Sequence, residues 1–492
     1  MRSSLAILLF ASLCLAAGCL SSGPAADDVY ERAEAAFEAG NYRTAEDLYG
    51  EAQNLSRESG DDDLALAAKR GVMRARYSHI EFPCNRSAAE AAMREKTPGI
   101  TGAEIDEWLD TRAQTLVSDN DTLYFGMTGA NYLYAHPARL RELAAGDLDI
   151  DRMGRYAWAD DRDEGHYTDP VRYTGSERLE IAGDILPETG TIRIWFPLPV
   201  ETASQREISV TNLSCPEYVK TGPVTTGDIG YLYCEIPAEA IDGDLVVSAD
   251  IAFTSYEQVF SIDPAQVGEY DTADPRYRKY TRSERNIRIT PGITALAREI
   301  VGDETNPARQ ARMIYDHIVM TYPYSRVPHS SLDIREPKVA ESTYMRETGH
   351  GDCGTQSMFF AALCRALGIP ARAIGGYQMI LSPQPGAHFW AEYLLPGYGW
   401  VPCDPTVAET ADWVRMSDEN RTRFRDYYAS RLDPCRYIIQ KTVDVPLDPP
   451  LPEDAVVFRL VRQTPAVVAP TADRDLNIAA MEGFTVDLSP GG

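Results

Sequence analysis

The chain has 492 residues, of which 44% are hydrophobic, and its 74 acidic and 47 basic residues give a formal net charge of −27 at pH 7. This length accommodates roughly two to four domains, and the hydrophobic fraction is sufficient for packed cores. The negative charge argues against nucleic acid and anionic membrane surfaces as partners, because both would repel the protein. It identifies no substrate, since a generally acidic proteome has the same bias.

The N-terminus predicts export. A short basic start is followed by an apolar run, residues 5–15, which is too short to span a bilayer and is typical of a signal peptide. The stretch Leu15-Ala16-Ala17-Gly18-Cys19 then resembles a lipobox, in which the Cys19 thiol receives the lipid. An ordinary signal peptide with an incidental cysteine is the alternative. We therefore expect a signal peptide over 1–18, a tether over 19–26, and a mature protein anchored to the outer face of the cell membrane by lipid at Cys19.

Residues 27–165 are predicted to form a helical domain. Within its first part, Gly40, Tyr49 and neighbouring small residues resemble the second half of a tetratricopeptide repeat. Because a single repeat has no copy to stack on, a plain helical hairpin and a surface for a protein partner both stay open. The helical pattern continues over 101–153, with a buried stripe expected at Ile105, Trp108 and Leu109.

Beta structure is predicted next, over 166–265, after a charged and turn-rich boundary that has no regular metal-loop spacing. Strand-like runs alternate there with turn signals, so a β-sandwich is expected. Residues 266–289 are polar and are predicted to be a linker. Two cysteine pairs could form disulfides in an oxidising exterior, although the sequence does not establish the connectivity: Cys215 with Cys234, and Cys403 with Cys435.

A catalytic core is predicted over 290–412, and its first sign is a cysteine at the start of a helix. Gly351-Asp352-Cys353-Gly354 leads into an apolar run without proline that stops at Gly368. Cys353 is therefore expected at the positive end of a helix dipole, where unpaired backbone N–H groups favour the thiolate. Cys364, further along the same helix, is expected to be a buried apolar side chain.

The second sign is a predicted hairpin. Two aromatic-rich runs flank a Pro/Gly turn at 396–399, which indicates an antiparallel pair. Folding the chain back there places Asp404 opposite a position within a few residues of His388. The carboxylate can then accept the imidazole N–H and stabilise the imidazolium, while the other ring nitrogen faces the Cys353 thiol. Thiol acyl transfer requires these three side chains in these roles.

Blocks of sequence in this region resemble the core of the transglutaminase-like superfamily in its prokaryotic form. They occur in order and cover about residues 290–410: Gly351–Gly354, Arg365–Arg372, His388–Glu392 and Tyr398–Thr406. The resemblance implies a papain-like fold, in which the helix that carries the cysteine packs on an antiparallel sheet. Carried over by position, it implies Cys353 as the nucleophile, His388 as the general base and acid, and Asp404 as the orienting carboxylate.

The oxyanion hole and the direction of the reaction stay open. The Cys353 backbone N–H is one oxyanion donor, and the candidates for the second are Tyr322, Tyr324, His329 and Gln356. Hydrolysis and transamidation share an acyl-enzyme and differ in whether water or an amine attacks it. Hydrolysis is preferred, because transamidation also requires an amine site and the exclusion of water.

Residues 413–492 are predicted to contain a charged helix and further strands, with a loosely held tail from Pro465. The expected fold class is multidomain α+β, with an N-terminal helical region, a β-sandwich and a papain-like core. We expect an extracytoplasmic, lipid-anchored thiol enzyme that acts on protein or peptide amides without a cofactor or a metal. A non-catalytic envelope protein that retains the fold is the alternative, and the intact set of Cys353, His388 and Asp404 argues against it.

Overall fold

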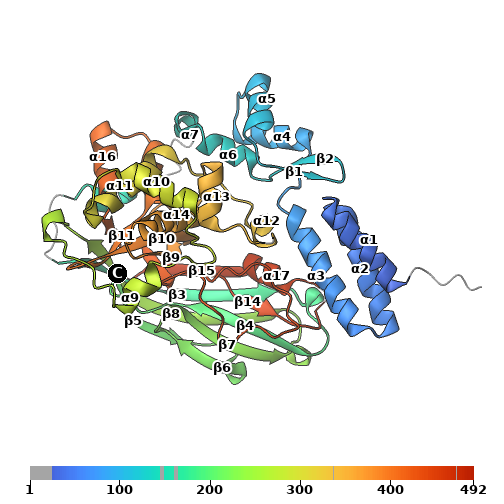
Figure 1. Cartoon of the computed structure of the whole chain (residues 1–492). Helices are drawn as coiled ribbons and strands as arrows, with labels where there is room; N and C mark the ends of the chain where they lie inside the picture. The colour runs from blue at the N-terminus through green and yellow to red at the C-terminus, as the bar shows by residue number, and fades with distance from the viewer. Residues whose placement is uncertain (1–24, 144–148, 160–164, 336, 473, 492) are drawn as a thin grey trace, which may run out of the picture. The chain divides into compact units, whose positions relative to one another are not determined.

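The computed structural model describes residues 25–143, 149–159, 165–335, 337–472 and 474–491 as a mixture of helices and antiparallel sheets (Figure 1). The predicted signal peptide and Cys19 lie outside the described residues. Within the described part of the chain, no helix is both long enough and apolar enough to cross a membrane. The chain divides into two compact units, one up to Ala75 and one from Arg76 onward.

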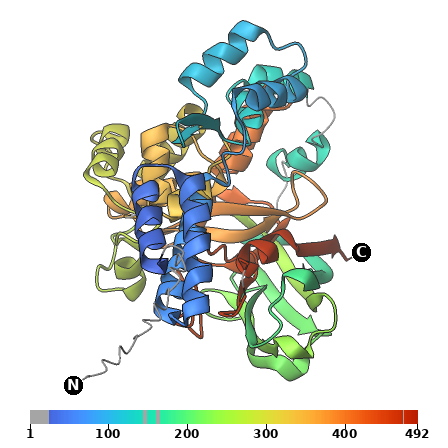
Figure 2. The ribbon, with the colours of Figure 1, turned by 90° about the vertical axis from the view of Figure 1, so that its right-hand side faces the viewer.

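The first unit is built from long helices, α1 (Ala26–Glu38), α2 (Tyr42–Ser59) and most of α3 (Asp62–His79). Helices α1 and α2 lie side by side as a hairpin (Figures 1 and 2), and Gly40 makes the turn between them with a φ of 79°. Small side chains let these helices approach closely, since Ala33 and Ala45 are fully buried beside Tyr49. The predicted hairpin is therefore present, and a partner for it stays a prediction.

The second unit begins with short helices, capped in part by their own side chains. Thr101 and Glu104 form a capping box at the start of α5, whose predicted stripe of Ile105, Trp108 and Leu109 is buried. The prediction of continuous helix here was wrong at 115–124, where Asp119 and Asn120 take positive φ in a tight hairpin. The elements are α4 (Arg86–Lys96), α5 (Gly102–Thr111), β1 (Thr115–Ser118), β2 (Asp121–Tyr124), α6 (Thr128–Tyr134), α7 (Pro137–Leu143) and α8 (Ile150–Ala157).

Two antiparallel sheets follow and share one buried core. A five-stranded sheet has the order β12-β8-β3-β15 with β5 paired to β8, and a four-stranded sheet has the order β14-β4-β7-β6. Leu179 and Phe253 from the first sheet pack in one cluster with Ile194 and Leu232 from the second. The strands are β3 (Tyr167–Ile181), β4 (Thr191–Leu198), β5 (Gln205–Thr211), β6 (Val219–Val224), β7 (Gly230–Pro237), β8 (Leu245–Val259), β12 (Arg431–Leu432), β14 (Ala466–Val468) and β15 (Phe484–Pro490).

The expectation of a loosely held tail from Pro465 was wrong. Strand β14 pairs with β4, and β15 pairs with β3 along its whole length from Phe484 to Pro490. Helix α17 (Leu476–Glu482) lies between these strands in the sequence and buries Leu476 in the same core. Pro465 and Pro470 flank β14, and Pro490 is the last residue of β15, so the prolines interrupt neither strand.

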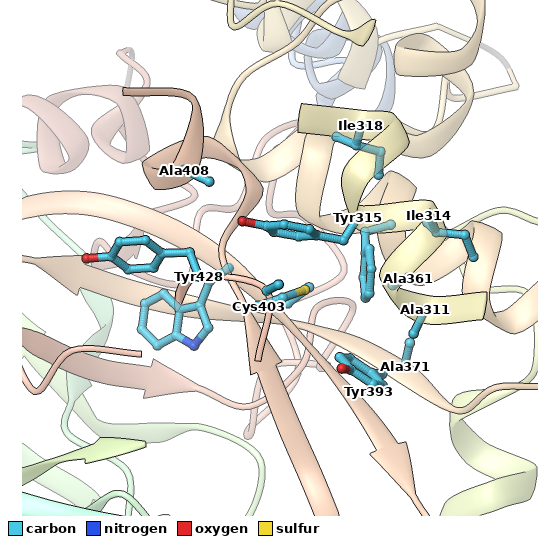
Figure 3. Close-up of a cluster of buried hydrophobic side chains, with 14 of the residues drawn as sticks. Ala311, Ile314, Tyr315, Ile318, Ala361, Ala371, Tyr393, Cys403, Ala408 and Tyr428 are labelled. Carbon is cyan, nitrogen blue, oxygen red and sulfur yellow. The ribbon is translucent and has the colours of Figure 1, made fainter. Parts of the chain in front are cut away.

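The second unit also contains a four-stranded antiparallel sheet of order β11-β10-β9-β13, against which α14 packs. Figure 3 shows the core between this sheet and the helices, where Ile314 and Tyr315 meet Ala361, Ala371 and Tyr393. Strand β13 follows the predicted end of the core at residue 412. The elements are α9 (Pro275–Tyr280), α10 (Pro291–Val301), α11 (Pro307–Thr321), α12 (His329–Asp333), α13 (Glu341–Thr348), α14 (Cys353–Ala366), β9 (Ala371–Gln378), β10 (Gly386–Leu395), β11 (Gly399–Cys403), α15 (Pro405–Glu409), α16 (Asp418–Tyr427) and β13 (Arg436–Gln440).

The cysteines of the described residues are free thiols. Cys403 and Cys435 do not form the disulfide that the sequence allowed. Cys403 is buried in the cluster beneath α14, whereas Cys435 contacts the Tyr173 hydroxyl in the sandwich. Cys215 and Cys234 are hydrogen-bonded neighbours, and both are thiols.

Candidate active site

Cys353 is the first residue of α14, as predicted. The Asp352 side chain caps the helix by accepting a hydrogen bond from the Thr355 N–H at 3.0 Å. Cys353 is partly exposed, whereas the helix from Gly354 to Arg365 is buried. One thiol is therefore presented to solvent at the positive end of a buried helix.

His388 and Asp404 meet through the predicted hairpin. Strands β10 and β11 pair in regular register from Leu395 with Gly399 to Ala391 with Cys403, so Asp404 follows directly where β11 ends. The Nε2 atom of His388 lies 2.8 Å from Oδ2 of Asp404. Cys353 lies close enough to His388 to add to the rise in the pKa of the imidazole. The three side chains predicted from the sequence thus lie in contact, in the order thiol, imidazole, carboxylate.

The charges at this site reinforce each other. Burial alone would lower the pKa of His388, but the Asp404 carboxylate more than offsets burial and raises that pKa to about 9. Burial would raise the pKa of Asp404, and the cations His388 and Arg436 reverse this and hold it well below its usual range. At neutral pH the imidazole is therefore protonated and the carboxylate is ionised.

Arg436 completes the site from β13, and the sequence analysis did not find it. Its Nη1 donates to Asp404 Oδ2 at 2.7 Å and its Nη2 donates to Asp433 Oδ2 at 2.7 Å. The guanidinium also lies 5.3 Å from the centre of the Trp390 ring. Arg436 and both carboxylates are buried. The sequence offered one sign of a buried, paired charge here, which is an arginine at the start of the apolar strand Arg436–Gln440.

A second buried ion cluster holds the start of α14. His329 Nε2 lies 2.7 Å from Asp352 Oδ2, and its Nδ1 lies 3.0 Å from Glu341 Oε1. Burial would lower the pKa of His329, but these two carboxylates raise it to about 10. Burial would raise the pKa of Asp352, and His329 is the main cause that brings it down to about 2. Both ring nitrogens of His329 are thus engaged within the protein.

The contacts of each candidate show which one can still serve as the second oxyanion donor. His329 is excluded because both of its nitrogens bind carboxylates. Gln356 is fully buried, and its Nε2 donates to the Gly351 carbonyl at 3.4 Å. Tyr322 is buried against Phe359. Tyr324 is partly exposed, and burial together with the nearby Cys353 raises the pKa of its hydroxyl well above the usual value, so it stays a neutral donor and is the candidate that remains.

Residues 294–405 match the family model of the Transglutaminase-like superfamily. The matched segment contains Cys353, His388 and Asp404. The resemblance seen in the sequence is therefore confirmed for this part of the chain. Within the described residues, no group of three or more histidine, cysteine or acidic side chains is arranged to hold a metal ion.

The chain is also similar to individual proteins. It is 24% identical over 313 residues to an uncharacterized protein of Haemophilus influenzae, which covers 57% of this chain and 80% of that protein. It is 31% identical over 105 residues to the protein-glutamine gamma-glutamyltransferase of Pseudomonas aeruginosa. That match covers 19% of this chain and only 16% of the transferase.

Solved structures give weaker likenesses. A protein described as a "Putative Cysteine Protease" from Cytophaga hutchinsonii is 15% identical, with a TM-score of 0.40 over 66% of this chain and 89% of that one. The periplasmic domain of TgpA from Pseudomonas aeruginosa is 16% identical, with a TM-score of 0.25 over 56% of this chain and 96% of that one.

Proposed function

We propose that this protein is a thiol enzyme that attacks protein or peptide amide bonds, with Cys353 as nucleophile, His388 as proton carrier and Asp404 as orienting carboxylate. The observation that carries the proposal is the 2.8 Å contact between His388 and Asp404 beside a partly exposed cysteine at a helix start. The membership of this segment in a superfamily of transglutaminase-like proteins supports it.

The reaction follows from the protonation states. The Cys353 thiolate attacks the amide carbon, and the oxyanion accepts a hydrogen bond from the Cys353 backbone N–H, with the Tyr324 hydroxyl as the candidate for the second donor. The C–N bond breaks as the His388 imidazolium gives its proton to the leaving amine. Water or an amine then attacks the thioester and passes a proton to the neutral imidazole. The C–S bond breaks, which releases the acid or the new amide and frees the Cys353 sulfur for the next cycle. Asp404 holds the ring in one tautomer throughout.

Hydrolysis is our preferred direction, because transamidation also requires an amine site and the exclusion of water. The remaining parts of the proposal concern location. We propose that lipid at Cys19 anchors the protein to the outer face of the cell membrane and that the helical hairpin α1–α2 offers a surface to a protein partner. A non-catalytic envelope role is the competing function.

The test uses purified protein incubated with a denatured polypeptide and a primary amine, with mass spectrometry of the products. Cleavage, deamidation and amine incorporation have different mass changes, so one experiment identifies the reaction. Cys353→Ala and His388→Ala should each lose turnover by at least about 1000-fold while the protein stays folded, which far-UV circular dichroism would check. Cys84→Ala, which removes another partly exposed thiol outside the core domain, is the control and should retain full activity. Full activity in Cys353→Ala would exclude the mechanism.

A further inference from the structure

A cavity of about 330 Å³ lies close to the nucleophile, between the short helices α5 and α6 and the loop that leads to α14. Its lining includes Trp108, Arg112 and Asn131 from the helical side and Tyr324, Ser325 and His350 from the loop side. The backbone of Tyr324 pairs with that of Gly351. Gly351 is two residues from Cys353, a span of at most about 7 Å of chain. The loop wall of the cavity therefore ends at His350, three residues before the proposed nucleophile.

The loop wall is held in position by amide side chains from the helical side. Asn131 accepts a hydrogen bond from the Arg326 N–H at 2.7 Å and donates to the Arg326 carbonyl at 3.1 Å. Gln114 donates to the Tyr344 hydroxyl and accepts from Asn131 at 2.9 Å. Asn131 thus pairs with the backbone of the wall as a neighbouring strand would. The cavity is preformed rather than dependent on closure of a loop.

Two arginines at this place have no carboxylate within ion-pair distance among the described residues. Arg112 lines the cavity and is exposed. Arg326 is also exposed, and its guanidinium lies 6.0 Å from the centre of the Tyr324 ring. The pKa of the Arg326 guanidinium is raised above its usual range by Tyr324 and, less strongly, by Cys353 and Asp352, which places this side chain near the nucleophile. Both guanidiniums keep their donors available to a ligand.

Aromatic side chains form a surface beside these charges. Tyr134 lies 4.8 Å from Tyr324 and 5.1 Å from Trp413, measured between ring centres, and Tyr324 lies 5.6 Å from Trp413. Each of the three is only partly buried. Rings of this kind bind the apolar parts of a peptide with little loss of conformational entropy. Positive charge and aromatic surface therefore occur together next to Cys353.

We propose that this cavity and its rim bind an acidic peptide, with a carboxylate at Arg326 and Arg112 and the neighbouring residues on Tyr134, Tyr324 and Trp413, so that an adjacent amide bond is presented to Cys353. This inference rests on the proposed function and names the substrate class of the same site. Planar guanidinium groups suit carboxylates because they can donate two parallel hydrogen bonds. The ligand carboxylate can belong to an acidic side chain or to a free C-terminus.

The test measures binding without turnover. Immobilised Cys353→Ala protein is exposed to a synthetic random octapeptide library, prepared with a free C-terminal carboxylate in one form and with a C-terminal amide in the other. We expect bound peptides to be enriched in Asp and Glu in both forms if a side chain is recognised. Retention of the free-carboxylate form alone would assign the site to a peptide C-terminus. Absence of any acidic preference in both forms would overturn the inference.

Variants connect the preference to the two arginines. Adding Arg326→Gln and Arg112→Gln to the Cys353→Ala protein should weaken the binding of selected peptides by roughly tenfold or more, since charged hydrogen bonds typically contribute about 1.5–3 kcal/mol. Arg285→Gln is the matched control, because Arg285 is exposed and has no ion-pair partner among the described residues. It should leave binding unchanged. Equal loss in the control and the double variant would overturn the assignment.

The same peptides separate the two proposals. If wild-type protein binds them through these arginines and does not cleave or modify them, the binding site stands and the proposed enzyme activity fails. If wild-type protein turns over acidic and neutral peptides with equal kcat/KM, the activity stands and the acidic subsite fails. The melting temperature of each variant should match that of the parent, because neither arginine side chain is buried.

Discussion

Four buried charges at the site balance one another. Asp404 and Asp433 are fully buried carboxylates, and the cations that face them are the His388 imidazolium and the Arg436 guanidinium. Buried ions are tolerated only when they are paired and hydrogen-bonded, since each would otherwise lose several kcal/mol of hydration. This pairing keeps His388 protonated at neutral pH, which is the form that can give a proton to a leaving amine.

The protonation of His388 predicts an alkaline limit to activity. We expect kcat/KM to fall as pH rises through about 9, where the imidazolium loses its proton. The protonated His388 also stabilises the folded state, because its pKa is higher there than in the unfolded chain. Its contribution to the free energy of unfolding is complete below the unfolded pKa of about 6.5 and is lost as pH rises through about 9. In Asp404→Asn the main cause of the raised pKa is removed while burial remains, so the alkaline limb should move to lower pH. An unchanged limb in the variant would mean that Asp404 does not control His388.

Arg436→Gln should separate stability from catalysis. The variant leaves Asp404 and Asp433 buried with one cation fewer, so the free energy of unfolding should fall by about 3–5 kcal/mol. The loss of a positive charge near His388 should also shift the alkaline limb of kcat/KM to higher pH.

Arg372→Gln is the matched control, because Arg372 is likewise buried and bonds Glu392 at 2.6 Å in the same sheet. It should lose comparable stability, measured by urea unfolding, and leave the pH profile in place. If the pH profile of kcat/KM shifts in both Arg436→Gln and Arg372→Gln, the shift results from general loosening of the sheet and not from the charge of Arg436.

The residues of the candidate site differed in how far the sequence could predict them. Cys353, His388 and Asp404 were predictable because local sequence patterns mark their positions. Cys353 starts a helix, and His388 and Asp404 belong to one hairpin. Arg436 was missed because it lies in another strand, 32 residues beyond Asp404, and strand pairing over that distance leaves no periodic trace. His329 was considered for the oxyanion hole, and its actual partners, Glu341 and Asp352, are also separated from it in sequence.

At the scale of elements, β9 is the strand that fixes the imidazole. It lies between β10 and β13, and Gly376 is paired with His388 on one side and Ile438 on the other. A Cβ atom at Gly376 would overlap the backbone carbonyl of Tyr437. The absence of a side chain therefore allows β13, and with it Arg436, to approach the site.

Gly376→Ala is accordingly expected to cost about 2–3 kcal/mol of stability, because the two strand backbones must separate. It should also lower kcat/KM at least tenfold by displacing His388. Gly386→Ala in β10 is the control, since its Cβ would meet no atom closer than Gln378 Nε2 at 3.4 Å. Thermal unfolding and kinetics on both variants provide the measurement. Equal effects of the two substitutions would contradict this role for β9.

Elements were predictable where a pattern of hydrophobic residues or a cap was local. Helix α11 begins at Pro307 after the Asn306 cap, and β10 and β11 form the expected hairpin. The hairpin β1–β2 was missed because each strand has only four residues. The alternation of apolar and polar residues that marks a strand is too short there to stand out between helices. The pairing of β14 and β15 with strands some 270 to 320 residues earlier could not be seen in any local window.

At the scale of the second unit, the C-terminal segment joins the sandwich to the site. Strand β12 pairs with β8 of the sandwich, and β13 pairs with β9 of the core sheet. Between β13 and β14, Gln463 donates to the His388 carbonyl at 3.0 Å. The chain then returns to the sandwich as β14 and β15. The C-terminal segment thus contributes strands both to the two sheets that share one core and to the sheet that carries His388.

This arrangement predicts that removal of the last strands unfolds more than the tail. Truncation after Thr464 deletes β14, α17 and β15, and with them buried side chains that include Val467, Leu476 and Leu488. Each such side chain contributes roughly 1.5–3 kcal/mol by burial, so the total approaches the entire stability of a typical domain, about 5–15 kcal/mol. The truncated protein should be insoluble or should unfold without a cooperative transition, and it should have no activity.

Truncation after Pro490, which keeps β15, is the control and should behave as the full chain in soluble yield and melting temperature. A truncated protein that melts cooperatively and retains activity would show that the core sheet folds independently of the sandwich.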